Sequence, residues 1–292
     1  MLIETSTRFA ELVETVSPSV VQVGAGGRAA SGLVYQPGFV LTTGRVVGRD
    51  EHPEVRTSDN RAFSAELAGW DPASRLVLLR VPELTAPALT PGALPRVGNI
   101  VLAIGRSLSN NVTASAGIVS IIGGPLRTGR KRQLDRVIRI SAPMHHGFAG
   151  GAVIGADGSL VGIATAAAIR GLPVVIPADI AWSAAAAMAE RKDLTRGYLG
   201  IAAQPVRVPE RQRAGGAGAE ALLVVSVKDG SPAADAGLLV GDVVVTFDGV
   251  PLSSPEDLID LLIGDRVGRP VTVTLLRGSS PVTVEVVPVA RP

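Results

Sequence analysis

The sequence predicts a mainly β protein made of two domains, and three observations support this prediction. The chain has 292 residues, which exceeds the usual size of one small domain. It contains 34 glycines and 21 prolines, and 46% of its residues are hydrophobic, a balance that favours short strands joined by turns. Short apolar runs with Gly or Pro at their joints recur along almost the whole chain.

Composition also excludes several kinds of chemistry and partner. The chain has no cysteine, so disulfides and thiolate catalysis are excluded. Its formal net charge of +2 does not indicate a nucleic-acid partner. It has no apolar run of about 20 residues, so no membrane span is expected. The first residues lack an apolar leader, and we therefore expect a cytoplasmic location, or a periplasmic or other extracytoplasmic one if an upstream signal or anchor has been removed.

The first domain is predicted to span residues 1–191. A short amphipathic helix at 7–16 places Phe9 and three aliphatic residues on one face. The basic stretch 127–136 is expected to be a solvated loop, and a helix at 177–194, with Pro177 near its start, closes the domain. Strands are expected in eight runs: 19–26, 31–43, 62–81, 99–105, 114–124, 136–141, 151–167 and 172–177.

A charged, turn-prone linker at 192–197 leads to a second domain at 198–292. The segment "GYLGIAAQPV" (197–206) leads into this domain, which contains one helix over 254–264. Ser254 is its expected N-cap, Pro255 the first helical residue and Asp257 a residue of the first turn. Its other apolar runs are predicted strands: 221–227, 243–252, 270–278 and 281–289.

Six segments resemble, in order, the motifs of one family. They are "VSPSVVQV" (16–23), "SGLVYQPGFVLTTGRVVG" (31–48), "GWDPASRLVLLRV" (69–81), "VLAIGRSLSNNVTASAGIVS" (101–120), "APMHHGFAGGAVIGADGSLVGI" (142–163) and "LPVVIPADIA" (172–181). With the second domain they make the chain similar to the HtrA/Deg family. The resemblance implies a chymotrypsin-like double β-barrel followed by a C-terminal PDZ domain.

All three catalytic positions that the resemblance implies carry the wrong residue. The histidine position is Arg45, the aspartate position is Arg75 and the serine position is Ala149. Serine-type hydrolysis needs a hydroxyl to attack, an imidazole to take its proton and a carboxylate to orient that imidazole. Ala149 has no nucleophile, and an arginine stays protonated at physiological pH. We therefore interpret the chain as a natural pseudoprotease and not an enzyme.

The turn around the serine position supports three further expectations. Gly147 and Ala149 would supply the backbone N–H groups of a vestigial oxyanion hole, and Phe148 would crowd the cleft. The neighbouring His145 and His146 are candidate metal ligands, although adjacent residues of an extended segment point to opposite sides. A metal-binding pseudoprotease and a weak residual serine-type peptidase are thus the alternatives to the main interpretation, which expects no cofactor.

The second domain is expected to hold the functional site. The segment "GYLGI" resembles the loop of a PDZ domain whose backbone N–H groups hold the terminal carboxylate of a peptide. Leu258 and Leu262 share one face of the predicted helix and would line the groove; that they are only core residues remains the other reading. The predicted peptide-binding residues are Tyr198, Leu199, Gly200, Ile201, Leu258 and Leu262.

These features favour a binding function. The chain is predicted to bind peptides or protein C-termini through its PDZ domain and to act as a scaffold or regulator, with an active HtrA paralogue as one possible target. The resemblance further implies assembly as a homotrimer or as a mixed oligomer with a protease paralogue, with Phe9 and its helix contributing. No nucleic acid and no membrane span is expected.

Overall fold

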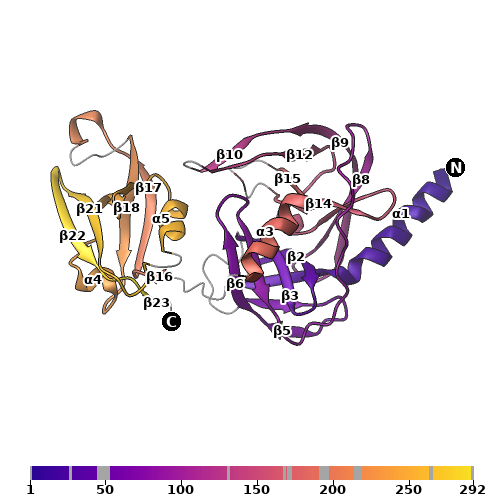
Figure 1. Ribbon diagram of the computed structural model, residues 1–292, viewed down its shortest axis with the longest axis horizontal. Coiled ribbons are helices and arrows are strands. Elements are labelled where there is room, and N and C mark those ends of the chain that lie inside the picture. The colour runs from indigo at the N-terminus through magenta and orange to yellow at the C-terminus, as the bar shows by residue number, and fades with distance from the viewer. Residues whose placement is uncertain are drawn as a thin grey trace. The chain divides into compact units, whose positions relative to one another are not determined.

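The computed structural model divides the chain into two compact units, Met1–Lys192 and Asp193–Pro292 (Figure 1). The structure describes residues 2–25, 28–44, 53–129, 132–166, 169, 173–190, 197–213, 219–262 and 266–290. The predicted linker, apart from Gly197, lies outside the described residues, as does Arg45. Each unit is described by itself below.

The first unit begins with a seven-stranded antiparallel sheet in the order β5-β4-β1-β2-β3-β7-β6. Its strands are β1 (Val20–Ala25), β2 (Arg28–Gln36), β3 (Phe39–Thr43), β4 (Glu54–Arg56), β5 (Ala62–Ser64), β6 (Glu66–Asp71) and β7 (Leu76–Arg80). Strands β2 and β3 are joined by the tight turn at Pro37 and Gly38, where Gly38 adopts φ +79°. The single strand region predicted at 62–81 is therefore three strands, β5, β6 and β7.

A closed barrel in the order β12-β15-β14-β13-β8-β9 follows. Its strands are β8 (Ile100–Arg106), β9 (Val112–Gly123), β12 (Val137–Ile140), β13 (Ala152–Gly155), β14 (Leu160–Ala164) and β15 (Val175–Pro177). Two further strands, β10 (Leu126–Gly129) and β11 (Arg132–Leu134), pair as a hairpin. The resemblance implied two barrels; closure is recorded for the second only, whereas the first is a seven-stranded sheet among the described residues.

Two long helices flank the first unit. The helix α1 (Leu2–Val16) starts earlier than predicted; its final turns pack Leu12 and Val16 into the core, while Ile3 is 83% exposed and the helix projects from the unit (Figure 1). The helix α3 (Ala178–Glu190) buries an alanine-rich face with Met188. Pro177, expected inside this helix, is the last residue of β15.

The core of the first unit extends to the turn that carries Ala149. A 3-10 turn, η2 (His146–Phe148), lies between β12 and β13. Phe148 and Ala149 belong to a buried cluster that also contains Val40 of the sheet and Val153 of the barrel. Each fully buried aliphatic side chain of such a cluster stabilises the fold by about 1.5–3 kcal/mol. Packing between the two sheets therefore fixes this turn.

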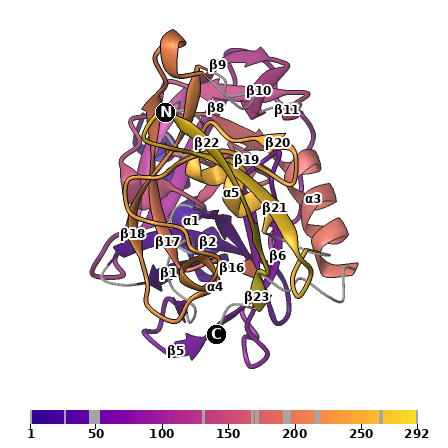
Figure 2. The same cartoon turned by 90° about the vertical axis from the view of Figure 1, so that its left-hand side faces the viewer.

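The second unit is a six-stranded sheet with two short helices (Figure 2). Strands β17, β18, β19, β21 and β22 follow one another in the sheet, and β20 pairs with β19. The elements are β16 (Gly197–Tyr198), β17 (Ile201–Arg207), β18 (Glu220–Val227), α4 (Pro232–Asp235), β19 (Val243–Phe247), β20 (Val250–Pro251), α5 (Pro255–Leu261), β21 (Val271–Arg277), β22 (Ser280–Val286) and β23 (Val289–Ala290). Two further 3-10 turns are described: η1 (Ser17–Ser19) belongs to the first unit, and η3 (Glu210–Gln212) belongs to the second.

Local signals account for several of these elements and miss others. Ser254 caps α5 by accepting from the Asp257 N–H, while the Asp257 side chain accepts from the N-cap backbone, so the predicted cap is confirmed as a capping box. The prediction of a loop at 127–136 is wrong, since this stretch contains the β10–β11 hairpin. Basic side chains on both strands conceal the alternation that would have indicated a hairpin.

No described helix is both long and apolar enough to cross a bilayer.

Candidate functional site

The structure brings together segments at or next to the three positions that the resemblance assigned to a catalytic triad. The Gly44 N–H donates to the Arg75 carbonyl oxygen at 2.9 Å. The Ser31 N–H donates to the Ala149 carbonyl oxygen at 2.8 Å, and the Thr42 hydroxyl donates to the Ser31 carbonyl oxygen at 2.6 Å. The ends of β3 and β7 and the turn after η2 therefore adjoin one another.

Both predicted oxyanion-hole donors are already occupied by acceptors within the turn. The Gly147 N–H donates to His145 Nδ1 at 3.0 Å, and the Ala149 N–H donates to the His146 carbonyl oxygen at 3.1 Å. An oxyanion hole requires preorganised donors that point at the developing charge. In this conformation the predicted hole is therefore not formed, because the side chain of His145 and the 3-10 geometry of η2 take up its two donors.

Ser31 holds the turn in this closed state from a distant part of the chain. Its hydroxyl donates to the Gly147 carbonyl oxygen at 2.7 Å and accepts from the Arg106 N–H at 2.7 Å. The Ser31 side chain is fully buried; its bond with Arg106 is buried and its bond with Gly147 is partly buried. Gly150, at φ +82°, allows the Ser31 backbone to approach the turn closely, because a Cβ there would lie 2.1 Å from the Ser31 carbonyl oxygen.

Arg75, at the predicted aspartate position, lies in a tight turn and supplies no carboxylate there. It adopts φ +59°, a left-handed conformation in which side chains are uncommon. Its N–H donates to the Asp71 carbonyl oxygen at 2.8 Å, and the Asp71 carboxylate accepts from the backbone and hydroxyl of Ser74. The nearby acid of this segment is thus engaged in holding the turn.

Trp70 explains the glycine at position 44. A Cβ built on Gly44 would lie 1.9 Å from the Trp70 ring, so only glycine fits there. Gly44 immediately precedes the histidine position, which lies outside the described residues. The sequence contained this signal in Gly44, but only the fold identifies its partner.

Phe148 and the two histidines of the η2 region have separate surroundings. Phe148 is 2% exposed and packs in the core, where the expectation had placed it in the cleft; its ring centroid lies 4.7 Å from that of His145. His145 and His146 are both exposed. Among the described residues no group of three His, Cys, Asp or Glu side chains is arranged to hold a metal ion. Nothing in this geometry favours the metal alternative.

The predicted carboxylate loop of the second unit contrasts with the closed turn. In the described part of the chain, the N–H groups of Leu199 and Gly200 have no acceptor, while their carbonyl oxygens accept from Ala233 and Lys228. Gly200 adopts φ +81°, and a Cβ there would lie 2.2 Å from the Ser231 Cβ. Successive unpaired N–H groups in such a loop form a concavity that binds anions.

Lys228 adds a positive charge beside this loop, and sequence reasoning missed it. Its Nζ atom lies 5.9 Å from the centroid of the Tyr198 ring, and its N–H donates to the Gly200 carbonyl oxygen at 2.8 Å. The side chain is exposed. An exposed cation beside the loop attracts an anionic ligand, most strongly at low salt. Its spacing of 28 residues or more from the loop gave no local signal.

Strand β17 leaves one edge of the sheet open next to the loop. Among the described residues it pairs with β18 alone, in an antiparallel register from Ile201↔Val227 to Arg207↔Glu220. An open edge of this kind accepts an extended peptide as an additional strand. The carboxylate loop runs directly into β17, so a bound chain terminus would continue along that edge.

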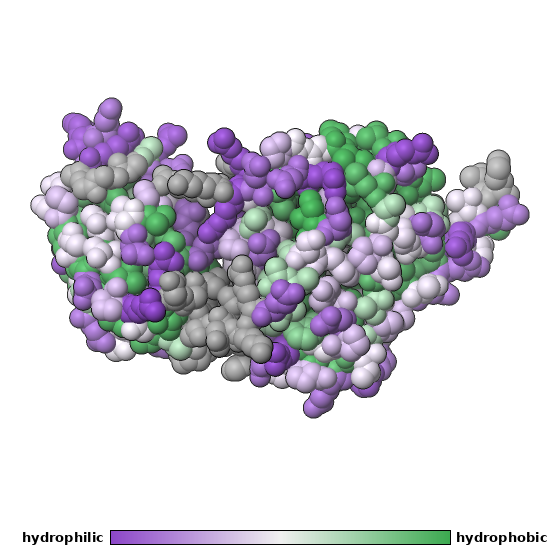
Figure 3. All heavy atoms as spheres, viewed as in Figure 1, coloured by the Kyte–Doolittle hydropathy of each residue, from purple (hydrophilic) through white to green (hydrophobic). Residues whose placement is uncertain are grey.

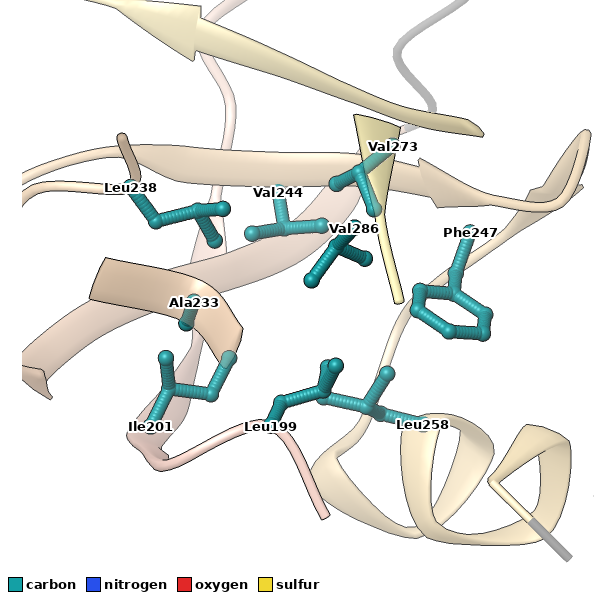
Figure 4. A pocket seen from close by; sticks show the side chains of 9 residues that line it. All are labelled: Leu199, Ile201, Ala233, Leu238, Val244, Phe247, Leu258, Val273 and Val286. Carbon is teal, nitrogen blue, oxygen red and sulfur yellow. The ribbon is translucent and has the colours of Figure 1, made fainter. Parts of the chain in front are cut away.

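A small apolar pocket, with room for little more than one water molecule, lies between the loop, the sheet and α5 (Figure 4). The side chains of Leu199 and Leu258 lie beside each other along one side of it. Three of the predicted groove residues, Leu199, Ile201 and Leu258, line this pocket. Leu262 is 7% exposed and packs in the core of the unit. The remaining lining residues are Ala233, Leu238, Val244, Phe247, Val273 and Val286.

Asp257 fixes the start of α5 and hence the position of Leu258. Its carboxylate accepts from the N–H and hydroxyl of Ser253, at 2.9 and 2.7 Å, and from the Ser254 N–H at 2.9 Å. Burial raises the pKa of Asp257, but these hydrogen bonds outweigh it and hold the pKa below its ordinary value. The helix that carries one side of the pocket is thereby anchored.

Comparisons with known proteins agree with this architecture. Residues 30–163 match the trypsin-like peptidase domain, and residues 197–287 match the PDZ domain. The chain is 29% identical to the periplasmic pH-dependent serine endoprotease DegQ of Escherichia coli, over 95% of this chain and 69% of DegQ. It is 31% identical to a probable periplasmic serine endoprotease DegP-like protein of Pseudomonas fulva, over 95% of this chain and 60% of that protein.

Solved structures give the same answer. The chain aligns with the HtrA-type protease AlgW, solved with a tripeptide, at 26% identity and a TM-score of 0.55, covering 97% of each chain. It also aligns with a serine endoprotease from Yersinia pestis at 26% identity and a TM-score of 0.53, covering 97% of this chain and 98% of that one. The matched domains, their order and these likenesses support the HtrA/Deg family for this chain, with a trypsin-like peptidase domain followed by a PDZ domain.

Proposed function

We propose that this chain is a non-catalytic HtrA/Deg protein that captures peptide or protein C-termini through its PDZ domain. One observation carries the proposal: the loop at Leu199 and Gly200 offers unpaired N–H groups beside an apolar pocket and an open strand edge. These three elements provide for a carboxylate, an apolar last side chain and an extended backbone. The related protease AlgW was solved with peptides, which supports the same use here.

The non-catalytic part of the proposal rests on the first unit. Ala149 has no nucleophilic atom, and the N–H groups of Gly147 and Ala149 both donate within the turn. The relatives are named serine endoproteases, so proteolytic activity would be expected from similarity alone. The residues of this turn argue against that activity. Losing a single triad member leaves about 10³–10⁴-fold acceleration over water. With all three positions substituted, capture without cleavage is the function that remains.

The test is a titration of labelled peptides against the whole chain. Peptides ending in an apolar residue are compared as the free acid and as the C-terminal amide. Binding of the free acid with loss of at least tenfold affinity for the amide supports capture at the loop, because the amide removes the charge that the N–H groups hold. Equal binding of both forms, or cleavage of either peptide, contradicts the proposal.

Self-assembly is a second part of the proposed function, supported by the outer face of β9. Outward positions of a barrel strand are normally polar, yet here they are Val112, Ala114, Ala116 and Ile118, and Ile118 pairs with exposed Ile100 of β8. Hydrophobic colour gathers over this part of the first unit (Figure 3). We propose that this face joins copies of the chain, or the chain and a protease paralogue, in the oligomer that the family resemblance implied.

Light scattering of the Ile118→Lys variant tests this part. Ile118 is 44% exposed, so the substitution leaves the core intact while charging the face. A fall from an oligomeric mass in the parent chain to a monomeric mass in the variant supports the assembly. A monomeric parent chain, alone and with an active paralogue, contradicts it.

The location of the chain is proposed from its relatives. These relatives are named periplasmic, and we therefore propose the extracytoplasmic alternative over the cytoplasmic one.

A further inference from the structure

The open edge of β17 does not offer a uniform series of hydrogen-bond donors. In an antiparallel strand the N–H and C=O of one residue face the same edge, and those of its neighbours face the other. The Gly200 carbonyl oxygen accepts from the Lys228 N–H at 2.8 Å, and the Val208 N–H donates to the Ala219 carbonyl oxygen at 3.0 Å. Even-numbered residues of this strand therefore face β18.

The odd-numbered residues consequently face the open edge. The register break between Ala202 and Ala203 leaves Val225 as the extra residue of β18, so the alternation along β17 itself is uninterrupted. Ile201 and Ala203 each present an N–H and a C=O to the edge. Pro205 is next in this series and has no N–H, and a proline in a strand is tolerated where its nitrogen faces away from the ladder.

This arrangement fixes how far a ligand can pair with the sheet. With its carboxylate on the loop and its chain antiparallel to β17, the ligand places its last residue opposite Ile201. Its third residue from the end then lies opposite Ala203, and its fifth lies opposite Pro205. The third residue can exchange both backbone hydrogen bonds with the edge. The fifth finds only the Pro205 carbonyl oxygen and meets the ring where a donor would stand.

We propose that Pro205 sets the length of the recognised segment, so that the PDZ groove reads only about the last three residues of a C-terminus. This rests on the proposed function of the same groove. The same proline protects the exposed edge, because an edge strand interrupted in this way is a poor template for pairing with other chains. A ligand of this site is therefore a short, free, apolar C-terminus and not a long extended segment.

The experiment measures affinity against ligand length in the whole chain. Peptides of three, five and nine residues share the same last three residues and a free carboxylate. We expect affinities within about twofold of one another. In Pro205→Ala, the tripeptide is expected to bind as before, whereas the five- and nine-residue peptides gain about fivefold, the value of one net hydrogen bond. Pro281→Ala, on the opposite edge strand β22, is the matched control and should change nothing.

The outcomes separate the two proposals. If the nine-residue peptide binds the parent chain more than tenfold tighter than the tripeptide, while binding still requires the free carboxylate, the length limit is wrong and C-terminal capture stands. The length limit is equally wrong if Pro205→Ala, with an unchanged melting temperature, gains nothing with the longer peptides. If no peptide binds, or the amides bind as well as the acids, the proposed function itself fails and the length limit with it.

Discussion

The carboxylate loop requires glycine at position 200, because a side chain there would collide with Ser231. The residue has φ +81°, and a Cβ would lie 2.2 Å from that of Ser231. We expect Gly200→Ala to weaken binding of a free-acid peptide by at least tenfold, because the loop must move to relieve the contact. Gly230 is the matched control, since it has φ +65° with no atom within 4 Å of its ideal Cβ. Titrations of both variants should show full affinity in Gly230→Ala; equal losses would mean that backbone conformation alone, not the contact, is responsible.

Ser31 is the residue on which the closed η2 turn depends. Its hydroxyl bonds the Gly147 carbonyl oxygen and the Arg106 N–H at 2.7 Å each, in a fully buried position. Ser31→Ala leaves both groups without that partner, and each lost buried bond costs about 1–3 kcal/mol. We expect the free energy of unfolding of the first unit to fall by about 2 kcal/mol, measured by denaturant titration. Ser120, an exposed serine of β9 in the same unit, is the reference for an Ala substitution, and an equal loss there would contradict this role.

The η2 turn, as an element, predicts how restoration of the triad will perform. Arg45→His, Arg75→Asp and Ala149→Ser together supply the missing side chains but leave the Gly147 and Ala149 N–H groups bonded within the turn. Loss of one oxyanion-hole donor costs about 10²–10³ in kcat. We expect cleavage of an unfolded protein substrate to be at least about 100-fold slower than by an active relative, measured as released fragments. Cleavage at the rate of the relative would show that the turn opens readily.

Sequence signals predicted the elements that depend on neighbours in the chain and missed those that depend on distant contacts. The capping box of α5 was predictable because Ser254, Pro255 and Asp257 are adjacent. The closed turn was not, since the Ser31 hydroxyl that holds it is 116 residues away from Gly147. Likewise Gly44 is visible in the sequence, but its contact with Trp70 requires the fold. The family resemblance predicted which positions would correspond to a triad, but it could not predict which hydrogen bonds the backbone N–H groups around Ala149 make.

Across the second unit, two carboxylates make stability depend on pH. Burial raises the pKa of Asp242, but hydrogen bonds from Arg277 and from the Leu239 N–H, with the charge of Arg277, hold it below the ordinary value of 3.8. The Arg277 Nε and Nη2 atoms contact its two oxygens at 2.9 and 2.8 Å. Asp257 is shifted in the same direction. A lowered folded-state pKa stabilises the unit above the unfolded pKa, and this stability is lost as pH falls through the folded pKa.

We therefore expect the unfolding temperature of the second unit to stay constant from pH 7 to about pH 5 and to fall below about pH 4. Calorimetry of the whole chain measures this. Asp242→Asn should lower the stability of the unit at pH 7 by about 2 kcal/mol and flatten its acid dependence, because the charge that Arg277 requires is gone. Asp229→Asn, an exposed position of the same unit, serves as control. An acid dependence unchanged by Asp242→Asn contradicts this assignment.

For the molecule as a whole, the central claim is that it holds a C-terminus without cutting it. Native mass spectrometry of the full chain incubated with an unlabelled apolar-ended peptide measures capture and integrity together. We expect one intact peptide bound per chain for the free acid, little or none for the amide, and no fragments after prolonged incubation. Fragments of the peptide, or equal occupancy by acid and amide, would contradict it.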